Sequence, residues 1–166
     1  MQSDGVLIMR IKLIFPILFI FLMGCDKAII SNEKHFLGEN NSKAFWTYSL
    51  NELYPDKKVK ALAKRAGNGE LNEIEQLVNE GVSPNSKGIM NVTPLYWAFR
   101  QNNIEGAKKL LQLGANPNIV FENGTSLIHL AARREVTLFL KLFLQHKANS
   151  NLVAGPLKIT PLFEVI

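Results

Sequence analysis

Apolar and polar residues follow a helical spacing through most of the chain after residue 56. In three successive segments, apolar side chains recur every three or four residues, which places them on one face of a helix. The pattern predicts an all-α region of short amphipathic helices. The apolar positions are Leu71, Ile74, Leu77 and Val78, then Ile104, Ala107, Leu110 and Leu111, then Leu140, Phe143 and Leu144.

Two sequence markers return between these helical segments with a nearly constant period. The first is TPLYWA at 93–98, SLIHLA at 126–131 and TPLF at 160–163, whose starts lie 33 and 34 residues apart. The second is GVSPN at 81–85, GANPN at 114–118 and KANSN at 147–151. A period of this length predicts stacked repeats, because each short unit must bury its apolar face against a neighbour.

The residue types in both markers suit the places that they hold in a repeat. Thr93 can cap a helix, and Pro94 fits the first helical turn, where a missing N–H costs nothing. Gly81 and Gly114 follow the second helix, where we expect a left-handed backbone that glycine adopts freely. Lys147 holds the third such place, and there it should cost up to about 1 kcal/mol.

The motif T-P-L-x-x-A, followed by a helix ending in L-L-x-x-G-A-x-P-N, resembles the ankyrin repeat over about residues 56–166. The resemblance implies an ankyrin-repeat solenoid of helix-turn-helix units joined by hairpin loops, with about three units and the start of a fourth. His129 matches the motif histidine, which implies a structural role. The segment KALAKR at 60–65 replaces the motif in the first unit, as is typical of a terminal cap.

The first 24 residues have the pattern of an export signal. Arg10 and Lys12 precede an apolar run at 13–23 that is too short to span a bilayer comfortably. Asp4 lies before this basic pair, and Met9 offers an alternative start of translation.

Cys25 follows this segment and is the single cysteine of the chain, which excludes a disulfide within it. The sequence LMGC at 22–25 resembles the bacterial lipobox, which implies a lipid on Cys25 and a membrane lipoprotein that faces the periplasm. Asp26 favours retention in the inner membrane, but Lys27 weakens that signal, so either membrane stays open. The alternative is an incidental cysteine in an ordinary signal peptide.

Residues 25–55 are predicted to form a lipidated tether that ends in a short aromatic segment. The stretch 26–42 has no periodicity and is rich in Asn, Ser, Glu and Lys. The segment 45–55, FWTYSLNELYP, predicts a short helix that stops at Pro55 and packs on the first repeat.

Composition and motifs argue against several classes of function. The chain is 47% hydrophobic with a net charge of +5, and its basic residues are scattered without interleaved aromatic side chains, so a nucleic-acid partner is not expected. The three histidines lack metal-ligand spacing, and no nucleophile motif or phosphate-binding glycine loop is present. We therefore expect no enzyme, cofactor, metal or small-molecule substrate.

Ankyrin proteins bind other macromolecules through hairpin tips and first helices, and the resemblance transfers these contact positions to ten residues. Three of them are apolar in the first hairpin, where exposed apolar side chains would indicate a partner site. The alternative is that these three pack against each other or against the aromatic segment. The ten residues are Ile89, Met90, Val92, Glu122, Asn123, Thr125, Arg100, Gln101, Arg133 and Arg134.

The whole-chain pattern resembles ankyrin lipoproteins that accompany phospholipase effectors of type VI secretion. Its elements are ELYPD at 52–56, AGNGELNEIEQLVNEGV at 66–82, TPLYWAFRQNN at 93–103 and GTSLIHLAAR at 124–133. This resemblance implies an immunity protein that binds the lipase. The alternatives are a periplasmic accessory of an endogenous enzyme such as catalase and, from another class, an enzyme with an unrecognised site.

Overall fold

The computed structural model describes residues 45–134, 137–154 and 160–161. The expected signal peptide, Cys25 and most of the tether lie outside the described residues. So does the expected apolar start of a fourth unit at 162–166.

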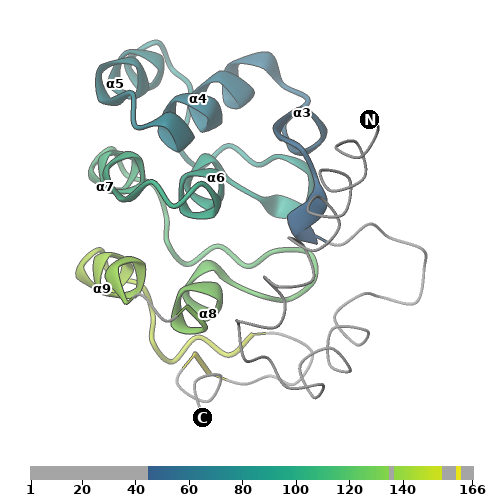
Figure 1. Cartoon of the computed structure of the whole chain (residues 1–166), viewed down its shortest axis with the longest axis vertical. Helices are drawn as coiled ribbons and strands as arrows, with labels where there is room; N and C mark the ends of the chain where they lie inside the picture. Colours follow the sequence, from purple (N-terminus) through teal and green to yellow (C-terminus); the bar gives the residue numbers. More distant parts are fainter. Residues whose placement is uncertain (1–44, 135–136, 155–159, 162–166) are drawn as a thin grey trace, which may run out of the picture. The chain divides into compact units, whose positions relative to one another are not determined.

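Three helix pairs stack on one another in the described part of the chain (Figure 1). The first helices of the pairs, α4, α6 and α8, lie in one layer, and their partners α5, α7 and α9 lie in a second. The described residues contain no β-strand beyond an isolated bridge between Val120 and Ser126. The all-α repeat fold is therefore confirmed. The pairs are α4 (Lys57–Asn68) with α5 (Leu71–Asn79), α6 (Pro94–Arg100) with α7 (Ile104–Gln112), and α8 (Leu127–Ala132) with α9 (Leu138–Gln145).

Side-chain caps fix the starts of two of these helices. Asp56 Oδ1 accepts hydrogen bonds from the Lys58 and Val59 N–H groups at the start of α4, and these bonds lower the pKa of the Asp56 carboxyl. Asn103 Oδ1 accepts from Gly106 N at the start of α7. Such caps satisfy N–H groups that have no partner within the helix.

Thr93 occupies the N-cap position of α6, with Pro94 in the first turn, as the sequence predicts. Its side chain forms no capping hydrogen bond, so that part of the expectation is wrong. The Thr93 backbone has the extended geometry of a cap, and its carbonyl instead accepts from Tyr96 N and from the hydroxyl of Tyr54.

Three residues that follow the second helices have the expected left-handed backbone. Gly81 has φ of 93°, Gly114 has 90° and Lys147 has 65°. The lysine confirms that the third unit keeps the turn geometry without a glycine.

The core lies between the two helical layers and runs through all three units. Phe99 packs edge-on against Phe139, with ring centroids 5.1 Å apart, and Phe143 lies against both rings. Aromatic side chains therefore join the second unit to the third. The fully buried side chains of Leu62, Ile74, Leu95, Leu110, Leu127 and Ile128 continue this core along the stack.

The aromatic segment at the start of the described chain forms a 3₁₀ turn, η1 (Phe45–Thr47), and a short helix, α3 (Leu50–Leu53). Ser49 and Glu52 form a capping box at the start of α3. Leu53 and Tyr54 are fully buried, and the helix ends just before Pro55, as predicted. The Tyr54 ring also contacts Trp97 edge-on at 6.4 Å, so the segment packs beyond the first unit and onto the second.

An asparagine ladder, formed by Asn85, Asn118 and their partners, connects the turns of successive units. Asn85 accepts from Asn116 N at 2.7 Å and donates to Gly114 O at 2.9 Å. Asn118 repeats both bonds one unit later, with Asn149 N at 2.7 Å and Lys147 O at 3.1 Å. The recurring Asn of the second marker therefore joins the turns of neighbouring units in the same way twice.

Candidate functional site

The two hairpin loops between units, which we call the fingers, project from the helical layers (Figure 1). The first finger (85–92) contains the 3₁₀ turn η2 (Ile89–Asn91) and is closed by a 2.7 Å hydrogen bond from Gly88 N to Val92 O. The second finger (118–125) is closed by a 2.8 Å bond from Phe121 N to Thr125 O.

A backbone hydrogen bond joins the two fingers. Glu122 N donates to Met90 O at 3.2 Å. Met90 and Asn91, at the tip of the first finger, both have left-handed backbones, with φ of 62° and 60°. The tips therefore form one continuous edge.

The ten predicted contact residues divide by exposure into three groups. Ile89, Gln101, Glu122 and Arg133 are exposed, and Ile89 keeps 47% of its surface accessible. Met90, Asn123, Arg100 and Arg134 are half-buried. Val92 and Thr125 are buried, with 0% and 4% of their surface accessible.

The expectation that Val92 and Thr125 are accessible to a partner is wrong, because both side chains are buried. Val92 belongs to the hydrophobic core, because the chain turns inward there to start α6. Thr125 lies next to the buried Ser126 at the start of α8. Their side chains shape the fingers from within, and a partner that docks on the surface does not reach them.

Met90 and Asn123 also have internal roles. Met90 packs against the core, and Asn123 Oδ1 accepts from Thr125 N at 3.0 Å within its own turn. Met90 and Val92 therefore pack on the hydrophobic core, whereas Ile89 stays exposed.

Arg100 is engaged within the molecule. Its guanidinium lies over the Trp97 ring, 4.9 Å from the centroid, and donates to the Tyr48 carbonyl. Arg100 therefore fastens the N-terminal aromatic segment to α6 through a cation–π contact and a hydrogen bond.

Arg134 stacks over Phe99 at 3.8 Å from the ring centroid and donates to Asn102 Oδ1 at 3.2 Å. Partial burial lowers the pKa of this guanidinium, although the group stays charged near neutral pH. Arg134 thus contributes to the joint between the second and third units, and only part of it can meet a partner.

His129 is buried and has a structural partner. Its Nδ1 lies 2.6 Å from Ser126 Oγ in the first turn of α8. The structural interpretation of the motif histidine is confirmed. In the described part of the chain, His, Cys, Asp and Glu side chains nowhere gather in a group of three that could hold a metal ion.

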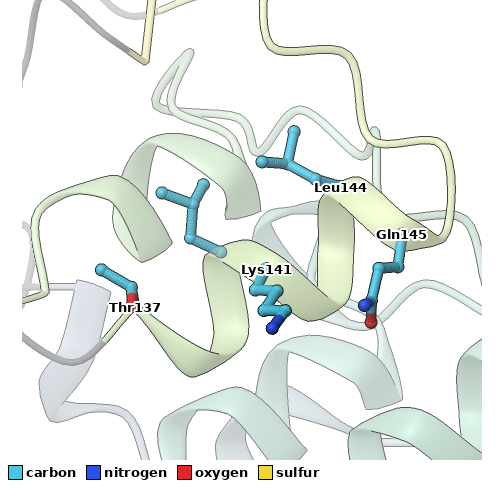
Figure 2. Close-up of a pocket in the computed structure, with 5 residues that line it drawn as sticks. Thr137, Lys141, Leu144 and Gln145 are labelled. Atoms are coloured by element: carbon cyan, nitrogen blue, oxygen red, sulfur yellow. The ribbon is translucent and has the colours of Figure 1, made fainter.

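Two recesses on the helices were not predicted from the sequence. The first, of about 440 Å³, lies along α9 and is lined by Thr137, Leu140, Lys141, Leu144 and Gln145 (Figure 2). A signal for it was present in LFLKLFLQ at 138–145, which is apolar on more than one face. The second recess, of about 500 Å³, lies between α3 and α4.

None of the helices in the described part of the chain has both the length and the apolar character that crossing a membrane requires.

The family model described as ankyrin repeats (3 copies) matches residues 34–121. The chain therefore belongs to the ankyrin-repeat family, whose repeats form a protein-interaction module.

Among its relatives, the ankyrin repeat domain-containing protein 40 of Mus musculus is 36% identical over 76 residues, covering 45% of this chain and 21% of that protein. The human palmitoyltransferase ZDHHC13 is 39% identical over 79 residues, covering 46% of this chain and 13% of that enzyme. Palmitoyltransferase AKR1 of Lachancea kluyveri is 28% identical over 118 residues, covering 70% of this chain and 15% of that enzyme. The chain thus matches about a fifth or less of each of these relatives, and the palmitoyltransferases share the repeats only.

Proposed function

We propose that this chain is a lipid-tethered immunity protein that faces the periplasm of a bacterium and binds a type VI secretion lipase effector through its fingers. The main support for this binding surface is the hydrogen bond from Glu122 N to Met90 O, which joins the two fingers. It holds an exposed apolar side chain and an exposed carboxylate on one edge, at Ile89 and Glu122.

The energetics of this edge favour a protein partner. A fixed backbone loses little conformational freedom on binding, so less of the interaction energy is spent on ordering it. Burial of the exposed half of Ile89 would contribute about 1 kcal/mol, and Glu122 adds charge selectivity at the rim. Gln101 and Arg133 extend the proposed contact onto the ends of α6 and α8.

The tether and the location of the partner rest on the sequence. The export signal and the lipobox-like LMGC at 22–25 support a lipid on Cys25, and the whole-chain resemblance supports the lipase. A membrane anchor would raise the local concentration of the inhibitor at the surface where a lipase acts.

The test is protection from the cognate effector. The product of each gene that neighbours this chain's own gene is expressed in the periplasm together with the parent chain, with Ile89→Asp, or with Leu71→Asp. Leu71 is also an exposed apolar residue, but it lies at the start of α5, away from the fingers. We expect Ile89→Asp to abolish protection and co-purification, while Leu71→Asp retains both.

Equal protection by the two variants would reject the finger edge as the contact surface. Failure of the parent chain to protect would reject the immunity function, and co-purification with a periplasmic catalase would indicate the accessory role instead. For the anchor, Cys25→Ser should lose labelled palmitate and leave the membrane fraction. Retention of both by the variant would reject lipidation at this residue.

A further inference from the structure

The recess between α3 and α4 is lined by charges of one sign. Lys57, Lys60 and Lys64 border it, together with Ser49, Leu50, Asn51 and Ala61. These lysines recur at helical spacing, so they share one face of α4, whereas Leu62, Ala63 and Ala66 on the opposite face are buried in the core.

The three lysines have no counter-charge in contact among the described residues. Among the described residues, neither an ion pair nor a side-chain hydrogen bond involves any of them. The acidic groups nearby are already engaged. Glu52 accepts from Ser49 in the capping box, Asp56 caps α4, and Glu70 pairs with Arg65 and feels only a long-range attraction from Lys64.

The need for a polar surface on the first unit does not by itself explain three neighbouring lysines without counter-charges in the described part of the chain. The exposed face of a terminal repeat must be polar, but mixed charges meet that need without the repulsion among three neighbouring cations. A groove with one sign of charge and a partly apolar floor is instead suited to a ligand of opposite charge. Leu50 and Ala61 are half-buried and supply that floor.

We infer that this recess is a second binding site, which takes an acidic peptide segment of a protein partner. Lys57 and Lys64 are seven residues apart on α4, which places their Cα atoms about 10 Å apart along the axis. An extended peptide covers that length in about three residues, so carboxylates three positions apart would reach both ends of the row.

The side chains around the recess favour a peptide over other anions. Ser49 and Asn51 offer hydrogen-bonding groups to a peptide backbone, and the floor accepts an apolar side chain between the two carboxylates. A flat bilayer surface would meet the lysines without filling the recess. Within the described part of the chain, no aromatic side chain lines it, as stacking of nucleic-acid bases would require.

The probe is a fluorescein-labelled peptide, GELSEG, titrated with the full chain in neutral detergent and followed by fluorescence anisotropy. The matched peptide GQLSQG removes both carboxylates. The test variant is Lys57→Gln/Lys60→Gln/Lys64→Gln, and the control is Lys87→Gln/Lys108→Gln/Lys141→Gln, which removes the same charge from exposed lysines elsewhere. Far-UV circular dichroism verifies that each variant folds.

We expect the parent to bind GELSEG but not GQLSQG, with affinity that falls as salt rises. The test variant should bind about tenfold more weakly, while the control stays within about twofold. The salt dependence of GELSEG binding and the comparison of GELSEG with GQLSQG both use the parent chain, so they test the site even if a variant fails to fold.

Two results would overturn the inference. They are no binding of GELSEG by the parent and equal losses in the two triple variants. In the first case, binding to phosphatidylserine vesicles that needs the three lysines would indicate a membrane surface as the ligand instead. The recess shares no residue with the fingers, so loss of protection by Ile89→Asp leaves this site untouched, and the two proposals can fail separately.

Discussion

The hydroxyl of Tyr54 donates a 2.7 Å hydrogen bond to the carbonyl of Thr93, in a place where both residues are buried. Tyr54 ends the short segment before the first unit, and Thr93 starts α6 in the second. One bond therefore connects the aromatic segment before the first unit to the motif threonine of the second unit.

Replacement of Tyr54 by Phe should lower the free energy of unfolding by about 1 kcal/mol, since the Thr93 carbonyl keeps its bond from Tyr96 N. The aromatic contact with Trp97 is retained in this variant. Urea unfolding followed by circular dichroism measures the change. An unchanged midpoint would show that the hydroxyl does not stabilise the fold.

The left-handed Lys147 predicts a stabilising glycine. Lys147→Gly should raise the free energy of unfolding by about 0.5–1 kcal/mol, because the side chain at φ of 65° is strained. Lys141→Gly makes the same chemical change in the middle of α9 and should cost about 1 kcal/mol. Shifts of the same sign in the two urea midpoints would contradict this interpretation.

The asparagine ladder predicts unequal effects from two similar residues. Asn118→Ala removes both side-chain bonds to the third unit and should cost about 1–2 kcal/mol. Asn151 holds the same place one unit later, but within the described residues only its backbone N–H is bonded, to Asn149 Oδ1. Thermal unfolding of Asn151→Ala should therefore match that of the parent, and a loss equal to that of Asn118→Ala would contradict the ladder.

Alkaline pH should destabilise the fold through its buried tyrosines. Burial raises the pKa of Tyr96 from 10.0 to about 12, and burial raises that of Tyr54 as well. The folded chain thus holds these protons more tightly than the unfolded chain. Their contribution is complete below pH about 10 and is lost as the pH rises toward about 12.

The measurement is the urea midpoint at several pH values across this window. Tyr96→Phe cannot ionise at this position, so its stability should fall less steeply than that of the parent. Parallel pH profiles for the two proteins would exclude Tyr96 as a source of the alkaline loss.

Local features of the fold could be predicted from the sequence because they depend on neighbours along the chain. Helical spacing located the second helix of each unit, and Gly81, Gly114 and Lys147 marked the left-handed turns. Pro55 marked the end of α3. Each of these signals acts over one or two helical turns.

The exposure of the predicted site could not be read in the same way. Val92 is buried because the end of the first finger packs into the core. The guanidinium of Arg134 stacks on Phe99, which lies in the preceding unit. The recess beside the lysines of α4 exists because α3 lies against that helix. These outcomes depend on packing between segments that are distant in sequence.

The asparagine ladder also has a consequence for how such a protein can change in length. Asn85, Asn118 and Asn151 lie 33 residues apart, and the first two form identical bonds. Duplication or deletion of exactly one period, such as 86–118, would leave every asparagine facing an equivalent turn. Gain or loss of whole units can therefore alter the reach of the fingers while the joints between units stay the same.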